Sequence, residues 1–222
     1  RDYATHSVPE HVFTVLLALR RNLIAYAAAA TNGTWSRAEN FCLHNWPIED
    51  LAGSTLGVIG GGTLGQSVAR LGAAFNMRVL LAEQRAASLR PGRVAFEQVL
   101  AEADVLSLHV PLTPATRNLI GAAELARMKP SAMLINSARG GVVDELALVG
   151  ALRAGQLAGA AVDVLTVEPP PADHPLLSAN IPNLLVTPHI AWASRQAQQQ
   201  LADEVVENIA AFLLGESRNR VV

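Results

Sequence analysis

Short apolar runs alternate with helical patterns along most of this chain. The runs that predict strands are Thr55–Ile59, Arg78–Leu81, Val105–His109, Met133–Asn136, Ala160–Val164 and Leu184–Thr187. The helical patterns between and after them are Leu64–Phe75, Phe96–Ala103, Glu124–Met128, Asp144–Ala154 and Ser194–Leu214. Strands and helices that alternate with such short connections are typical of a parallel, doubly wound sheet. The pattern therefore predicts an α/β fold.

The segment before the first strand has a different pattern. From Ser7 to about Ala30, apolar residues occupy most of the helical circumference, and Ser7 and Glu10 match a capping box. A helix that is apolar all round has to be buried, and one surface stripe would not bury it. At the edge of a domain, a second copy of the chain could provide the covering surface.

Composition narrows the classes of protein. Half of the 222 residues are hydrophobic, which suits a sheet buried on both faces. The net charge of −2 points to neither a nucleic-acid nor a membrane partner. Cys42 is the one cysteine, so an internal disulfide is excluded and a reducing, cytoplasmic location is expected. No apolar stretch reaches the length of about 18 residues that a transmembrane helix requires.

A glycine-rich turn, Gly60-Gly61-Gly62-Thr63-Leu64-Gly65, links the first predicted strand to a helix. Gly60 permits a tight turn, Gly62 lets backbone amides approach a pyrophosphate, and Gly65 lets the helix pack close to the sheet. The helix N-terminus then offers free N–H groups to the phosphates. The spacing predicts a dinucleotide-binding turn. The alternative is a turn that merely packs.

An acid follows the next predicted strand. Glu83 can accept hydrogen bonds from both hydroxyls of an adenosine ribose and would repel a 2′-phosphate, which favours NAD over NADP. Arg85 lies two residues further on and could hold that phosphate instead. If the turn only packs, Glu83 would be solvated.

Three chemically active residues follow the carboxyl ends of separate strands, where open parallel sheets bind ligands. Arg139 can hold a substrate carboxylate through two parallel hydrogen bonds. His189 can pass a proton to or from a substrate oxygen, and Glu168 can orient its ring. Taken singly, each could be a surface or loop residue. Rival imidazoles exist as well: His6, His11 and His109 are candidates, whereas His44 and His174 are expected to be solvated loop residues.

These residues lie within longer segments that, together, resemble the D-isomer-specific 2-hydroxyacid dehydrogenases, and most closely their hydroxypyruvate reductase (glycerate dehydrogenase) branch. The segments are Thr5–His11, the glycine turn, His109–Thr113, Asn136–Glu145, Ala161–Val164, Glu168-Pro169 and Thr187–Trp192. They run almost end to end and in family order. The ones around Arg139 and His189 are more specific than the glycine turn.

The resemblance implies a Rossmann NAD-binding domain and a set of site residues. Its catalytic residues fall on Arg139, Glu168 and His189, with no metal ligand. The residues implied to bind the coenzyme are Gly60, Gly62, Thr63, Leu64, Gly65, Glu83, His109, Val110, Pro111, Thr116, Ser137, Ala138 and Asp163. Among them, His109 contributes backbone beside the coenzyme, and Asp163 lies near the nicotinamide carboxamide.

The resemblance also divides the chain. Residues 1–189 are expected to form the dinucleotide-binding domain, including a dimerisation helix over 8–30. Residues 190–222 are expected to form a C-terminal segment that returns toward the family's substrate domain. Most of that second domain, of an ordinary domain size of roughly one hundred residues, has no counterpart in the sequence. The chain, which starts at Arg1, reads like the interior of something longer, and we expect it to bind NAD but to turn over poorly alone.

The implied activity is hydride transfer between NAD(H) and a small 2-oxoacid or D-2-hydroxyacid in a homodimeric enzyme. Hydroxypyruvate/D-glycerate and glyoxylate/glycolate are the preferred substrate pairs. One alternative is a formate dehydrogenase-like enzyme, although that branch pairs its histidine with an amide where this chain has Glu168. The other is an NAD-gated corepressor that uses the same scaffold to bind proteins.

Overall fold

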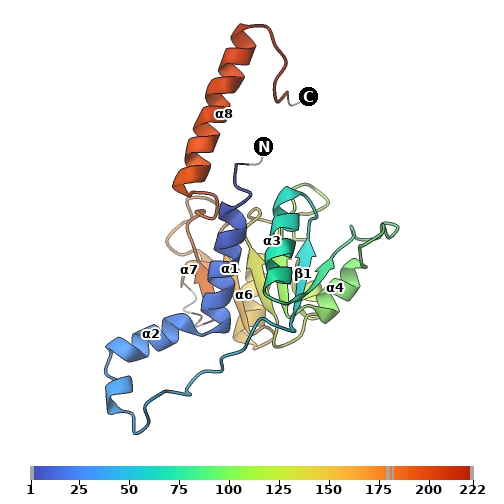
Figure 1. Cartoon of the computed structure of the whole chain (residues 1–222). Coiled ribbons are helices and arrows are strands. Elements are labelled where there is room, and N and C mark those ends of the chain that lie inside the picture. The colour runs from blue at the N-terminus through green and yellow to red at the C-terminus, as the bar shows by residue number, and fades with distance from the viewer. Residues whose placement is uncertain (1–2, 179–180, 182, 221–222) are drawn as a thin grey trace.

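The computed structural model describes residues 3–178, 181 and 183–220. Its centre is a six-stranded sheet with the order β2-β1-β3-β4-β5-β6, in which every pairing is parallel (Figure 1). The strands are β1 (Thr55–Ile59), β2 (Arg78–Leu81), β3 (Val105–Leu108), β4 (Met133–Asn136), β5 (Gly159–Val162) and β6 (Leu184–Val186). The predicted parallel α/β sheet is confirmed.

Three predicted strands end slightly too late. The prediction carried β3 to His109, β5 to Val164 and β6 to Thr187, whereas each strand leaves the sheet earlier. Val164 is still buried after β5 has ended. The buried apolar run therefore continues past the carboxyl end of β5, into the loop that leads to Glu168.

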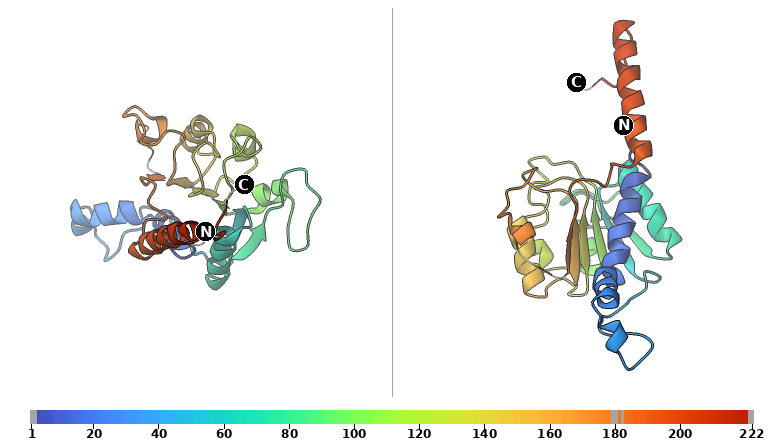
Figure 2. Two further views of the ribbon diagram at one scale, coloured as in Figure 1. Left: turned by 90° about the horizontal axis from the view of Figure 1, so that it is seen from above. Right: turned by 90° about the vertical axis from the view of Figure 1, so that its left-hand side faces the viewer.

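Helices cover both faces of the sheet, as the right-hand view of Figure 2 shows. The helices after β1 are α3 (Thr63–Ala74), α4 (Phe96–Glu102), α5 (Ala122–Leu125), α6 (Glu145–Arg153) and the short α7 (Pro175–Ser178). Leu106 and Leu134 pack on the side of α4, α5 and α6. Their neighbours Val105 and Ile135 pack on the opposite side, with α1 (Ser7–Arg20) and α3. This alternation gives the sheet an apolar core on each face.

The long N-terminal helix expected over 8–30 is wrong as a single element. The chain forms α1 and α2 (Leu23–Thr31), which are bent by 60° relative to each other, followed by a short 3-10 turn η1 (Trp35–Arg37). Asn22 breaks the helix, because its backbone is left-handed with φ 49°. Its side-chain amide donates to the Pro47 carbonyl at 2.6 Å, so a distant segment holds the break in place.

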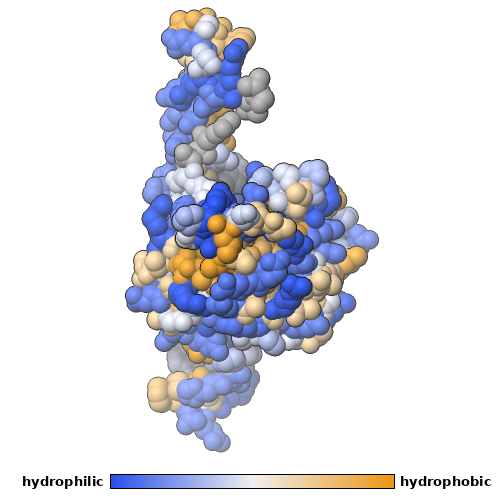
Figure 3. Space-filling view, turned by 90° about the vertical axis from the view of Figure 1, so that its right-hand side faces the viewer, coloured by the Kyte–Doolittle hydropathy of each residue, from blue (hydrophilic) through white to orange (hydrophobic). Residues whose placement is uncertain are grey.

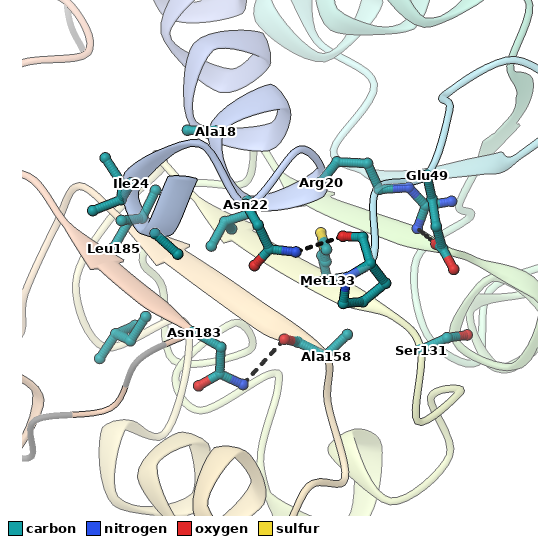
Figure 4. A pocket seen from close by; sticks show the side chains of 14 residues that line it. Ala18, Arg20, Asn22, Ile24, Glu49, Ser131, Met133, Ala158, Asn183 and Leu185 are labelled. Carbon is teal, nitrogen blue, oxygen red and sulfur yellow. Dashed lines mark hydrogen bonds and ion pairs between the residues drawn. The ribbon is translucent and has the colours of Figure 1, made fainter. Parts of the chain in front are cut away.

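The junction between α1 and α2 borders a cavity of about 310 Å³ at the end of the sheet away from the glycine turn (Figure 4). Arg20 forms an ion pair there with Glu49 at 2.9 Å. Beyond the junction, α2 projects from the body of the molecule (Figure 1). Ala29 is its one buried residue, and Leu23 and Ile24 are exposed. The helix is therefore not buried all round within one chain.

The predicted capping box is also wrong. His6 occupies the N-cap of α1 without a side-chain bond, and the Ser7 hydroxyl instead donates to the Ala191 carbonyl at 2.7 Å. The Ser7 hydroxyl thus bonds to a residue distant in sequence, Ala191, and not to the backbone of its own helix. The start of α1 is thereby tied to the loop that follows β6.

The last helix, α8 (Arg195–Leu213), stands away from the sheet (Figures 1 and 2). The Ser194 hydroxyl caps it by accepting from the Ala197 amide at 3.1 Å, and it stops before Gly215, whose φ is 72°. Figure 3 shows apolar side chains at its far end. The exposed ones are Ile209, Phe212, Leu213 and Leu214.

Among the described residues, no single helix has both the length and the apolar character needed to cross a membrane. The bent pair of α1 and α2 passes that test only when the two are counted together.

Candidate active site

The glycine turn leads from β1 into α3 with little room for side chains. Gly60 has φ 101°, and a Cβ added to it would lie 2.2 Å from the His109 carbonyl oxygen. A Cβ on Gly65 would lie 1.9 Å from the Gly60 carbonyl oxygen. By contrast, a Cβ on Gly62 would meet open space, at the N-cap of α3. The turn is thus closed on its inner side and open where an anion would meet the helix amides of Thr63 and Leu64.

A second feature of this edge is an unpartnered hydroxyl. The Ser137 Oγ, just after β4, is buried and has no hydrogen-bond partner among the described residues. Buried polar atoms are rarely left without a partner, and a water, an ion or a ligand is among the groups that complete them. Ser137, Leu64 and Arg139 line the same cavity of about 400 Å³. The open turn and this hydroxyl both fit a bound dinucleotide.

The loop after β3 passes beside the glycine turn. The His109 amide donates to the Ile59 carbonyl at 2.7 Å, which holds His109, Val110 and Pro111 against the turn. Burial lowers the pKa of His109 to about 4, so its ring is neutral at pH 7. The Thr116 hydroxyl donates to the Pro111 carbonyl at 2.6 Å and closes the loop on itself.

Glu83, at the end of β2, is not solvated, contrary to what a merely packing turn would give. Its side chain is 3% exposed, and Arg90 donates to its two oxygens, from Nε and Nη2, at 2.6 Å each. These bonds, with one from the Gln84 amide, lower the pKa of Glu83 to about 2.

The arginine on Glu83 was missed by the sequence analysis, which singled out Arg85. The Arg85 guanidinium pairs with Glu124 at 2.5 Å and lies over the Phe96 ring at 4.6 Å. Arg90 returns to Glu83 because the loop closes at its base through two hydrogen bonds between backbone groups, Glu83 to Val94 and Val94 to Leu81. No local signal in the sequence marks that closure.

The structure brings His189 and Glu168 into contact. The His189 Nδ1 lies 2.7 Å from the Glu168 Oε2. Burial raises the pKa of Glu168, but the hydrogen bonds from the Leu165 amide and His189, with the charges of His189 and Arg139, outweigh it and hold that pKa below its usual range. Glu168 is therefore ionised at neutral pH and faces the imidazole as a carboxylate.

Arg139 completes the group. It and His189 line the same cavity, and its Nη1 donates to the Ala138 carbonyl at 2.6 Å. Glu168 lies on the other side of His189, where it lines an adjoining apolar cavity of about 500 Å³. The residues predicted from three separate loops thus meet at one edge of the sheet, with a cation and an imidazole facing the same space.

Asp163 borders this cavity as well, and its carboxylate is already engaged in hydrogen bonds within the protein. It accepts hydrogen bonds from the Thr187 hydroxyl at 2.6 Å and from the amides of Ile190 and Ala191 at 2.9 Å each. The structure thus shows it anchoring the loop that carries His189.

The other histidines differ in their surroundings. His11 contacts the same loop through Thr187, His6 is exposed, and His44 lies 3.3 Å from the Cys42 sulfur. His174, expected to be solvated, is 5% exposed and lies 3.1 Å from Glu145, so that expectation is wrong. The described residues contain no group of three or more His, Cys, Asp or Glu that could hold a metal ion.

Comparison with known proteins agrees with this geometry. Residues 13–191 match the model for "D-isomer specific 2-hydroxyacid dehydrogenase, NAD binding domain". Glycerate dehydrogenase of Methylorubrum extorquens is 49% identical over 221 residues, which cover 100% of this chain and 69% of that protein. Hydroxypyruvate reductase of Blautia hydrogenotrophica is 32% identical and is covered to 69%.

A solved structure gives the same result. D-lactate dehydrogenase of Lactobacillus jensenii, solved with NAD+, superposes with a TM-score of 0.85 at 30% identity, over 99% of this chain and 69% of that one. The chain belongs to the D-isomer-specific 2-hydroxyacid dehydrogenases, which are NAD-linked enzymes, and carries their NAD-binding domain.

Proposed function

We propose that this chain transfers hydride between NAD(H) and hydroxypyruvate/D-glycerate or glyoxylate/glycolate, and that Arg139, Glu168 and His189 are its catalytic residues. The observation that carries the proposal is the 2.7 Å contact of His189 with Glu168, beside a cavity that Arg139 also lines. Relatives named glycerate dehydrogenase, hydroxypyruvate reductase and glyoxylate reductase support the choice of substrates.

Each residue has a chemical task. Because Nδ1 of His189 is engaged by Glu168, Nε2 is the atom that passes a proton to the substrate oxygen or takes one from it. The Glu168 carboxylate holds the ring in that orientation. The Arg139 guanidinium binds the substrate carboxylate and polarises the neighbouring carbonyl. When bound, the nicotinamide supplies or accepts the hydride.

The proposed coenzyme is NAD(H) rather than NADP(H), held by the turn at Gly60, Gly62 and Gly65 with Glu83 on the ribose. Support comes from Glu83 being a carboxylate at the end of β2. Arg90 occupies that carboxylate, so a ribose diol has to displace one or both of the bonds that Arg90 makes.

We place the boundary of the coenzyme domain at residue 189, with 190–222 as a separate C-terminal segment. The family match ends at residue 191, and α8 stands apart from the sheet. We also propose a homodimer in the cytoplasm, with neither nucleic acid nor membrane as a partner. The exposed apolar residues of α2, the single Cys42 and the net charge of −2 support these assignments.

The test is the substitution His189→Gln, which keeps a polar side chain but cannot serve as a general acid or base. The chain alone is expected to turn over poorly, and from that low value we expect kcat for reduction of a 2-oxoacid to fall by roughly two to four orders of magnitude. NADH affinity, followed by its fluorescence, should stay close to that of the parent protein. If kcat is retained, His189 is not the acid–base group and the proposed function fails.

A further inference from the structure

The loop that carries His189 is wrapped around one buried carboxylate. Oδ1 of Asp163 accepts from the Thr187 hydroxyl and the Ile190 amide, and Oδ2 accepts from the Ala191 amide. The His189 amide donates to the Asp163 carbonyl at 2.8 Å. Both the backbone and the side chain of Asp163 therefore hold the loop.

His189 itself has an unusual backbone. Its φ is 56°, in the left-handed region that residues other than glycine seldom adopt. The direction of its imidazole therefore depends on the hydrogen bonds that keep the loop in this conformation. A small shift of the loop would turn the ring away from Glu168.

His11 reaches this loop from the other end of the sequence. It lies on α1, its side chain is 14% exposed, and its Nε2 is 3.2 Å from the Thr187 hydroxyl oxygen and 3.7 Å from Oδ1 of Asp163. The Thr187 hydroxyl donates its one hydrogen to Asp163, so toward His11 it can act only as an acceptor. The network thus assigns the His11 proton to Nε2.

The His11 ring can donate to the Thr187 hydroxyl while it is neutral. Burial lowers the pKa of His11, although the charge of Asp163 opposes that effect. At neutral pH the ring therefore carries one N–H, which points at the hydroxyl and the carboxylate. An apolar side chain would fill the same space but would leave the hydroxyl without its donor and the Asp163 charge without a facing dipole.

We propose that His11 is a positioning residue: its Nε2–H fixes the Thr187 hydroxyl against Asp163, and this holds the His189 loop in its active conformation. The inference rests on the role proposed above for His189. In this proposed role, His11 contacts neither the substrate nor the coenzyme. It acts through Thr187 and Asp163. A second hydrogen bond also ties α1 to this loop, from the Ser7 hydroxyl to the Ala191 carbonyl.

Matched variants separate a donor from a space-filling residue. His11→Leu removes the N–H, whereas His11→Gln keeps an N–H near the same place. We expect His11→Leu to lower kcat by about tenfold to a hundredfold, as misplacement of catalytic groups does, with the KM for NADH unchanged. His11→Gln should stay within about threefold of the parent protein. Thr187→Val should behave like His11→Leu, and Thr187→Ser should behave like the parent protein.

The pair can be tested for coupling. If His11 acts through Thr187, the double variant His11→Leu/Thr187→Val should lose no more activity than either single variant. The proposal is overturned if His11→Leu keeps its kcat, if a folded His11→Gln is as impaired as His11→Leu, or if the two losses add.

Hydrogen exchange of the backbone amides of Thr187, His189, Ile190 and Ala191 gives a readout that needs no turnover. Exchange should be faster in His11→Leu than in the parent protein and unchanged in His11→Gln; equal rates in all three would refute the anchoring role. We expect the parent chain to reduce 2-oxoacids slowly; if it reduces none at all, the proposed function fails separately, and the exchange rates decide the role of His11.

Discussion

The Arg90 side chain changes the hydrogen-bonding state of Glu83, the acid expected to bind the coenzyme ribose. Glu83, just after β2, is the acid that we propose binds the coenzyme ribose, yet its two oxygens are bound by the Arg90 guanidinium, which is itself exposed to solvent. An exposed arginine can leave the carboxylate or remain near it to meet a phosphate. We therefore expect these two side chains to influence the choice between NAD(H) and NADP(H).

Arg90→Met tests this choice. Removing the guanidinium frees Glu83 for the ribose diol and removes a cation that could bind a 2′-phosphate. We expect the ratio of NADH to NADPH affinity to rise by about tenfold, the value of one charge-assisted hydrogen bond. Titrations monitored by nucleotide fluorescence measure both affinities. Arg85→Met is the matched control from the same loop and should leave the ratio unchanged, since Arg85 is bound to Glu124; an equal shift in both variants would contradict the assignment.

The same ion pair predicts a dependence of stability on pH. The pKa of Glu83 is lowered from 4.5 to about 2, so its stabilising bonds are present at neutral pH and are lost as pH falls from 4.5 toward 2. We expect Glu83→Gln to be less stable than the parent protein at pH 7, with the difference shrinking steadily below pH 4.5. Urea unfolding at several pH values measures it. A difference independent of pH would show that the charge of Glu83 does not contribute.

At the scale of elements, the break between α1 and α2 depends on one asparagine. Asn22 adopts φ 49° and donates to Pro47. Asn22→Ala should cost about 1–2 kcal/mol of unfolding free energy, since it loses this hydrogen bond and places alanine in a left-handed conformation. Asn22→Gly also loses the hydrogen bond, but glycine adopts the left-handed conformation readily, so the loss of unfolding free energy should be smaller. Denaturant unfolding of the two variants measures these losses of unfolding free energy. Equal losses would show that the left-handed backbone at residue 22 is not strained by alanine.

Most of the sheet could be predicted from the sequence because buried parallel strands are continuous apolar runs, and each was found to within a residue or two. The α1–α2 break could not, because it depends on Pro47 and Glu49, which return to the helix only after folding. The same holds within the site. Arg139, Glu168 and His189 were predictable from the edge they share, whereas Arg90 and the network of His11 with Thr187 depend on tertiary closure.

At the scale of the whole molecule, the projecting α2 is the surface on which the proposed homodimer depends. Ile24 is 61% exposed and borders the cavity at the α1–α2 junction. If α2 is covered by a second copy, Ile24→Glu should convert a dimer into a monomer in sedimentation experiments. Leu146→Glu is the matched control, because Leu146 is an equally apolar residue, 70% exposed, on α6. Dissociation by both variants, or by neither, would remove α2 from the interface.

The far end of α8 has a practical consequence. Its exposed phenylalanine and leucines, Phe212, Leu213 and Leu214, lie at the end of a helix that stands clear of the sheet. Such a tip can meet its counterpart on another molecule without any rearrangement of the catalytic edge. Self-association at high concentration would then begin far from the proposed active site. We expect an aggregated sample to keep its affinity for NAD(H).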